Sequence, residues 1–128
     1  MLDFNKIMEK LIEFRDDRDF KRFHTTKNLT ISICIKAANL LETFQWRDDE
    51  KIKQIIKSEK KTEIEEKVAE IMIFLMYLCN NLGISSDNIE AAIYSKIIKE
   101  SANMQLTGQP EIPHNISNSK IYKFKNEE

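Results

Sequence analysis

The sequence predicts an all-α fold. Apolar residues recur at the three- and four-residue spacing of a helix face along most of the chain. Only two glycines and two prolines occur in 128 residues, which is too few for a turn-rich β fold. Residues suited to helix caps precede several of the periodic runs. The chain is therefore expected to form a bundle of about five helices.

Each expected helix has its own pattern. A polar loop at 21–27 separates the first from the second, and the second is apolar on nearly all sides, which predicts a central position. Asp48 is suited to start the third helix. Thr62 and Glu65 have the spacing of a capping box for the fourth, and Gly83 is suited to end it. The predicted helices span residues 2–20, 28–43, 49–57, 62–81 and 86–101, to within about 2–4 residues at each end.

The composition argues against several protein classes. A net charge of -1 gives no electrostatic basis for binding nucleic acid. The longest apolar run, 71–79, is far shorter than the roughly 20 residues that span a bilayer, so no membrane partner is expected. Cys34 and Cys79 lack metal or disulfide spacing, and we expect buried, reduced thiols in a cytoplasmic protein, either bacterial or phage-encoded. Residues 1–105 are expected to form one helical domain and residues 106–128 an irregular tail.

Two charged side chains stand alone in apolar helices. Lys36 is the only charged residue in 28–41, and Glu70 is the only one in 68–80. A lone buried charge is costly, so each should have a partner, a ligand or water. The two could form a buried salt bridge between packed helices. Alternatively, polar residues at helical spacing could border a shared cleft; they are Lys36, Asn39 and Glu42 on one helix and Glu63, Glu66, Lys67 and Glu70 on the other.

Three stretches within residues 11–99 resemble the MazG-like and dCTP pyrophosphatase family. Residues 14–29 contain Phe-His, a basic residue and Asn-Leu in the order of that family's N-terminal signature. Residues 40–46 read Leu-Leu-Glu-Thr-Phe-Gln-Trp, similar to the family's Leu-x-Glu-x-Phe-Gln-Trp. Gly-Ile at 83–84, followed by Lys96, resembles the segment after the second metal-binding helix.

This resemblance implies an all-α homodimer or dimer of dimers that hydrolyses nucleoside triphosphates to monophosphate and pyrophosphate. It also implies a Mg²⁺ site built from Glu-x-x-Glu on one helix and Glu-x-x-Asp on the next. Carboxylate oxygens suit Mg²⁺, and the metal would organise the phosphates and the attacking water.

The chain departs from that metal site. The first pair of ligands aligns with Lys36 and Asn39, and the second with Lys67 and Glu70. An ammonium has hydrogen-bond donors but no acceptor, so it cannot ligate a cation. The charge of the cluster changes from about -4 to about +1. Three further family positions, often Asn and Tyr-Pro, are replaced by Glu100, Met104 and Gln105.

Residues that the resemblance places beside the nucleotide persist where the metal ligands do not. We expect them to line or flank one cleft and to bind nucleotide without metal. Each also has an ordinary alternative, as a core aromatic, a loop histidine or a solvated lysine. The expected nucleotide-binding residues are Phe20, His24, Lys27, Asn28, Lys36, Asn39, Trp46, Lys67, Glu70 and Lys96.

Three functions follow from these patterns. The first is a nucleotide-binding protein without hydrolytic activity and without cofactor, in which lysines contact phosphate directly, for sequestration or sensing. The second is an active Mg²⁺-dependent pyrophosphohydrolase with a rebuilt site, for which Glu42, Glu66 and Glu70 are the metal candidates, with Glu63 nearby. The third is a structural or interaction module that keeps the fold alone.

Overall fold

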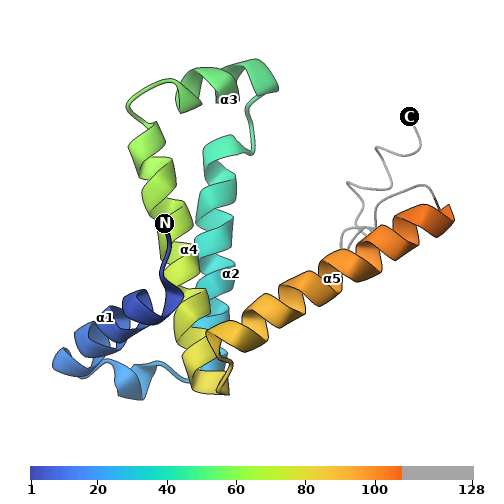
Figure 1. Ribbon diagram of the computed structural model, residues 1–128. Coiled ribbons are helices and arrows are strands. Elements are labelled where there is room, and N and C mark those ends of the chain that lie inside the picture. Colours follow the sequence, from blue (N-terminus) through green and yellow to red (C-terminus); the bar gives the residue numbers. More distant parts are fainter. Residues whose placement is uncertain (108–128) are drawn as a thin grey trace. The chain divides into compact units, whose positions relative to one another are not determined.

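The computed structural model describes residues 1–107, and all the regular elements between them are helices, without a strand (Figure 1). The predicted all-α class is confirmed. The chain divides into a unit from Met1 to Ser86 and a second that starts at Asp87. The elements are α1 (Phe4–Asp17), a short 3-10 helix η1 (Lys21–Phe23), α2 (Thr26–Phe44), α3 (Asp49–Ile56), α4 (Lys61–Leu82) and α5 (Ser86–Thr107).

Local backbone signals set the boundary between α1 and α2. Helix α1 ends at Asp17, short of the predicted residue 20, and Asp19 then adopts a φ of 54°, which a right-handed helix excludes. Thr25 Oγ1 accepts a hydrogen bond from Asn28 N at 3.1 Å, so α2 starts two residues earlier than predicted. The expected loop at 21–27 is therefore partly helical.

The cap predictions for α3 and α4 have mixed outcomes. Asp48 Oδ1 accepts from the third residue of α3 at 2.8 Å, as expected. The capping box predicted from Thr62 and Glu65 is wrong, because α4 begins directly after Lys60, whose side chain makes no capping hydrogen bond. At the other end of α4, Gly83 ends the helix as predicted, in the left-handed region at φ 67°.

Helix α5 is longer than predicted. It runs to Thr107, past the expected end at residue 101 and into the segment expected to be an irregular tail. The rest of the predicted tail lies outside the described residues. The predicted division of the chain into a domain and a tail remains a prediction. No single helix within residues 1–107 is long and apolar enough to cross a membrane.

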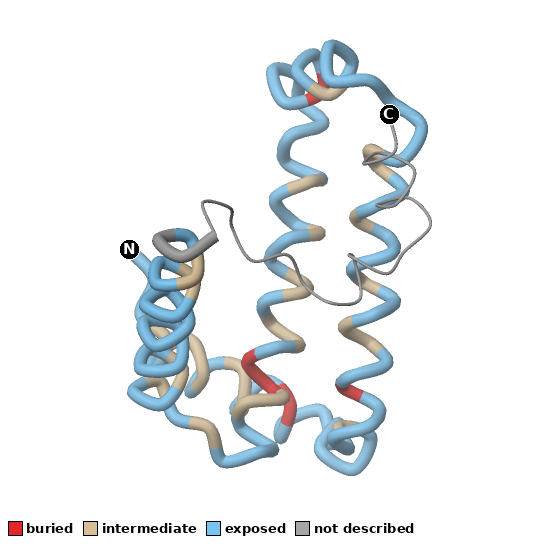
Figure 2. Tube along the Cα trace, turned by 90° about the vertical axis from the view of Figure 1, so that its right-hand side faces the viewer, coloured by how far each residue is buried: buried red, intermediate tan, exposed pale blue. Residues whose placement is uncertain are grey.

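Helices α2 and α4 form the centre of the first unit. The chain runs along α2, crosses through α3 and returns along α4, so the two long helices are antiparallel neighbours (Figure 1). Helix α1 packs on α4, where the buried Tyr77 donates a hydrogen bond to Leu11 O at 2.8 Å. Full burial is confined to few positions, and most of both long helices is exposed or half-buried (Figure 2).

The thin core corrects one sequence prediction. Helix α2 is central, as predicted, although Leu29 is its only buried residue. Cys34 on the same helix is exposed, so the prediction of two buried thiols is wrong for that residue. Cys79 on α4 is half-buried, and burial raises the pKa of its thiol. Both cysteines are free thiols.

Candidate functional site

An ion pair joins the middle of α2 to the middle of α4. Lys36 Nζ lies 2.8 Å from Glu70 Oε1, and the two side chains are 29% and 46% exposed. These are the lone charged residues that the sequence pattern singled out. Water reaches both groups, so the pair is not the fully buried salt bridge of the structural alternative. A partly exposed pair of this kind contributes about 1 kcal/mol or less to stability.

A second lysine lies along the same helix interface. Lys67 Nζ donates to Thr43 Oγ1 at 2.8 Å, and both residues are half-buried. Since an ammonium has three donors, this contact leaves two of them for another acceptor. Asn39, the remaining substituted position, is exposed on α2. The structure thus holds two ammonium groups where the resemblance expects carboxylates.

Glu70 also borders an aromatic cavity of about 420 Å³ between α1, the segment before α2, and α4. The His24 and Tyr77 rings lie 4.6 Å apart, centroid to centroid. The mixture of aromatic walls and one carboxylate suits a planar ring that carries polar groups. The lining residues are Leu11, Phe14, Phe20, His24, Glu70, Ile73, Phe74 and Tyr77.

His24 is electrostatically unusual within this cavity. Its Nδ1 is buried and makes no hydrogen bond to the described residues. Burial is the main cause that lowers the pKa of His24, and the positive charge of Arg15 adds to it. The lowered pKa favours the neutral imidazole, whose ring forms part of the aromatic wall of the cavity.

Arg15 was not among the predicted site residues. It is 4% exposed, and its Nε donates to Asp16 Oδ1 at 3.0 Å. Its carbonyl accepts from Phe20 N at 2.9 Å, which fixes the turn that brings Phe20 to the cavity. Full burial of an arginine is uncommon. The signal available in the sequence was its position in the N-terminal motif at 14–29.

Other predicted residues lie apart from these contacts. Trp46 is 88% exposed and does not line the aromatic cavity. Lys27 is exposed, and Asn28 Nδ2 donates to Phe23 O at 3.1 Å, a structural contact at the start of α2. Lys96 lies on α5, in the second unit. A nucleotide-binding role for these four residues remains a prediction.

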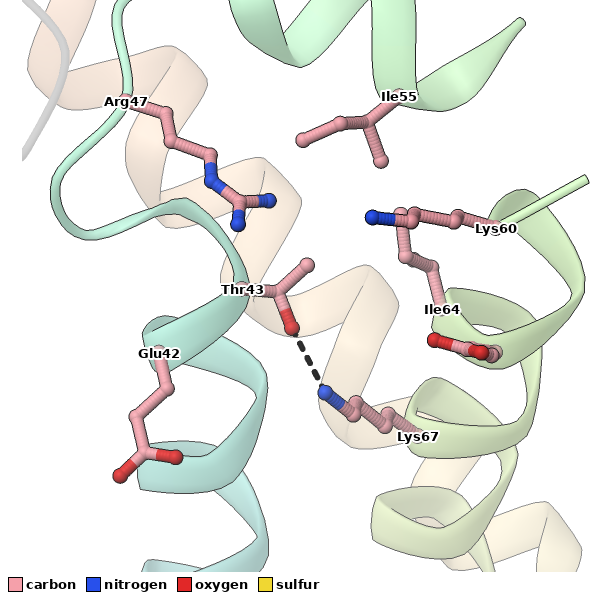
Figure 3. A pocket seen from close by; sticks show the side chains of 8 residues that line it. Glu42, Thr43, Arg47, Ile55, Lys60, Ile64 and Lys67 are labelled. Carbon is pink, nitrogen blue, oxygen red and sulfur yellow. Dashed lines mark hydrogen bonds between the residues drawn. The ribbon is translucent and has the colours of Figure 1, made fainter. Parts of the chain in front are cut away.

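A polar hollow of about 290 Å³ lies under α3, at the end of the α2–α4 pair (Figure 3). Lys67 was among the predicted site residues, whereas Arg47 and Lys60 were not, because both stand in polar connections between helices. The lining residues are Glu42, Thr43, Arg47, Ile55, Lys60, Glu63, Ile64 and Lys67.

The side chains at the family's metal positions do not fit Mg²⁺. Lys36 and Lys67 offer only donors, and Lys36 occupies an oxygen of Glu70, the one carboxylate of the set. Between residues 1 and 107, no three or more His, Cys, Asp or Glu side chains form a group that could hold a metal ion. The described residues of one chain therefore do not form the rebuilt metal site for which the candidates were Glu42, Glu66 and Glu70.

Comparison with known proteins establishes the relationship. A model of the MazG-like family matches residues 31–107, which is more than half of the chain. The chain belongs to the MazG-like family. The match includes both lysines and Glu70 but begins after the motif at 14–29.

Solved and curated relatives of this MazG-like chain carry pyrophosphatase names. A crystal structure of a pyrophosphatase from Archaeoglobus fulgidus superposes with a TM-score of 0.67 at 36% identity, covering 77% of this chain and 89% of that one. dCTP pyrophosphatase 1 from Bos taurus is 31% identical over 67 residues, which is 52% of this chain and 40% of the relative. The Rattus norvegicus protein is 27% identical over 86 residues, 66% and 49% respectively. The matches thus span half or less of these curated relatives.

Proposed function

We propose that this MazG-like chain binds a phosphate-bearing nucleotide without metal and holds it without efficient hydrolysis, as a sequestering or sensing protein. The observation that carries the proposal is the Lys36–Glu70 contact of 2.8 Å at the family's metal-ligand positions. This contact holds the solvent-accessible ammonium of Lys36 at a position where a metal cation would otherwise be needed to bind phosphate.

The lysines suit phosphate oxygens. Lys36 donates one hydrogen to Glu70, and Lys67 donates one to Thr43. Each ammonium therefore keeps two donors for a ligand. Lysine binds phosphate as a point charge. Glu70 belongs to the ion pair and also borders the aromatic cavity. A ligand with phosphate at the lysines would therefore have its base near Phe20 and His24.

Hydrolysis lacks its usual means of activation at these positions. In the resembling enzymes the metal polarises phosphate and lowers the pKa of the attacking water. An ammonium can neutralise part of the phosphate charge but has no lone pair with which to deprotonate water. Binding without turnover is the chemistry that this donor set supports.

An active pyrophosphohydrolase is the second candidate, and the names of the relatives favour it. Catalysis would then use carboxylates outside the aligned set, or from another copy of the chain. An interaction module is the third candidate, in which the Lys36–Glu70 pair serves only to join two helices.

One experiment separates the three candidates. The protein is mixed with nucleoside mono-, di- and triphosphates, including dCTP, with Mg²⁺ or with EDTA, and both thermal unfolding and pyrophosphate release are measured. Binding at a hundredfold excess over Kd stabilises by about 2.7 kcal/mol. Stabilisation that survives EDTA without product supports the proposal. Mg²⁺-dependent release at about 1 s⁻¹ or faster indicates the enzyme, and no response to any nucleotide indicates the module.

Restoration of the carboxylates tests the reason for inactivity. The variant Lys36→Glu, Asn39→Glu, Lys67→Glu has four carboxylates at the family positions with Glu70. It should bind Mg²⁺ in calorimetry and gain Mg²⁺-dependent pyrophosphate release, while it loses nucleotide binding in EDTA. The matched control is Lys53→Glu, an exposed position on α3, which should leave all three properties unchanged.

A further inference from the structure

Three cationic side chains from separate segments meet at the hollow under α3. Arg47 follows the end of α2, Lys60 precedes α4, and Lys67 lies within α4. In Figure 3 the guanidinium of Arg47 and the ammonium of Lys60 point toward each other across the hollow, with Lys67 below them. Like charges that face each other repel, and an anion between them would offset that repulsion.

None of the three cations forms an ion pair with the described part of the protein. The side chains of Arg47 and Lys60 form no hydrogen bond or ion pair with residues 1–107, and Lys67 bonds only the neutral hydroxyl of Thr43. Glu42 and Glu63 line the same hollow but form no ion pair with the described residues. Glu42 points away from Lys67 (Figure 3). The three cations stand against the two carboxylates of Glu42 and Glu63, so the lining side chains carry a net charge of +1.

Apolar side chains close one side of the hollow. Ile55 of α3 is 5% exposed, and Ile64 of α4 is half-buried beside it. Apolar walls reduce solvent screening, so the cations attract an anion more strongly than they would on an open surface.

We propose that this hollow is a polyphosphate subsite, which takes the di- or triphosphate end of the nucleotide ligand. Arg47 presents a planar guanidinium for two oxygens of one phosphate, and the lysines act as point charges on its neighbour. Three converging cations match a multiply charged anion better than a monophosphate. The assignment of this anion to a nucleotide rests on the proposed function.

Lys67 connects the subsite to the rest of the site. It lines the hollow, and it stands three residues from Glu70 on α4, a rise of about 4.5 Å along the helix. Phosphates beyond the one at Lys36 would therefore extend along α4 into the hollow. The ligand class is thus a nucleoside di- or triphosphate, and a nucleoside monophosphate or cyclic monophosphate would leave the hollow empty.

Calorimetry on the full chain in EDTA tests the subsite with pyrophosphate and tripolyphosphate alone. Both should bind, with an affinity that falls as salt is raised. Arg47→Gln and Lys60→Gln should each weaken binding about tenfold or more, as expected for the loss of a charge-assisted contact. Arg47→Lys should retain part of the affinity. Lys53→Gln, on the opposite side of α3 from Ile55, should bind as the wild type does, and circular dichroism checks that every variant is folded.

Failure of the subsite can be told from failure of the proposed function. If neither probe binds, or if both glutamine variants bind them like the wild type, the subsite is overturned. If dCTP and dCMP bind with equal affinity and Arg47→Gln affects neither, the subsite is also overturned while nucleotide binding stands. If pyrophosphate binding depends on Arg47 but no nucleotide binds, the hollow remains a polyphosphate site and the proposed function fails.

Discussion

Lys36 Nζ lies 2.8 Å from Glu70 Oε1, so one of the substituted metal positions directly engages the single carboxylate that the aligned set retains. The lysine therefore both removes a ligand and occupies the oxygen that a metal would need. A phosphate that approached Lys36 would meet the same carboxylate as a competing anion. The pair thus has different consequences for stability and for binding.

Substitution of each partner separates these consequences. Lys36→Gln should weaken nucleotide binding about tenfold or more, because a charge-assisted contact is lost. Glu70→Gln should preserve or raise the affinity, because it removes the competing anion. Both changes should alter the free energy of unfolding by about 1 kcal/mol or less, since the pair is partly exposed. Calorimetry and urea unfolding provide the measurements.

The control for this pair is Glu9→Gln, an exposed carboxylate on α1. It should change neither affinity nor stability. A pair with only a structural role would give similar stability losses for both substitutions and no difference in ligand affinity, which would contradict the proposed function.

Tyr77 links α4 to α1 through a single hydrogen bond. Its hydroxyl donates to Leu11 O at 2.8 Å, and the residue is 4% exposed. Tyr77→Phe should keep the ring packing and lower the free energy of unfolding by about 0.5–1.5 kcal/mol. Tyr77→Ala also leaves a cavity and should cost about 3–5 kcal/mol. Urea unfolding measures both, and an unchanged midpoint for Tyr77→Phe would show that this hydrogen bond does not contribute.

The sequence predicted the parts of this molecule that depend on local pattern. Periodicity located the helices, and the cost of an isolated charge predicted that Lys36 and Glu70 would each need a partner. The start of α4 was misplaced because Thr62 and Glu65 have the spacing of a capping box but not the backbone position that would use it. Sequence spacing does not reveal which of two possible residues begins a helix.

The hollow under α3 was missed for a different reason. Arg47 and Lys60 stand in polar connections, where charged residues usually face solvent, and only the path of the chain through α3 brings them together. Trp46 illustrates the converse, since a large aromatic residue beside an apolar helix suggests a pocket wall, yet it is 88% exposed in the first unit. Loop geometry decides both cases, and helical periodicity contains no information about it.

His24 predicts a pH dependence of stability. Its pKa lies below the ordinary 6.5 because of burial and then the charge of Arg15. Between the native pKa and 6.5 the unfolded chain binds a proton that the native chain does not. The contribution of His24 to the free energy of unfolding is therefore fully present above pH 6.5 and is lost as the pH falls toward the native pKa of this residue.

The variant His24→Phe, which keeps an aromatic ring against Tyr77, should remove this part of the pH dependence in urea unfolding between about pH 7 and 5. The control is His114→Gln, at the chain's other histidine, which lies outside the described residues. An NMR titration of His24 with an apparent pKa at or above 6.5 would contradict the prediction.

Two rows of exposed apolar residues on the long helices predict self-association. Ile31 and Ile35 are four residues apart on α2 and are 46% and 53% exposed. On α4, Val68 and Met72 are each 41% exposed and line an apolar groove of about 450 Å³ with Ile56. So few residues are fully buried in the first unit that a second copy of the chain is the expected cover, as a homodimer or a dimer of dimers.

Light scattering on the full chain at micromolar concentration should therefore give about two or four times the 15.1 kDa mass of one chain. Met72→Lys places a charge in the groove and should shift the protein toward the monomer, because an unpaired charge at an apolar interface is costly. Glu66→Lys, which introduces the same side chain at an exposed polar site of α4, should keep the wild-type mass. A monodisperse wild-type monomer would refute the assembly, and equal masses for wild type and Met72→Lys would place the interface elsewhere on the chain.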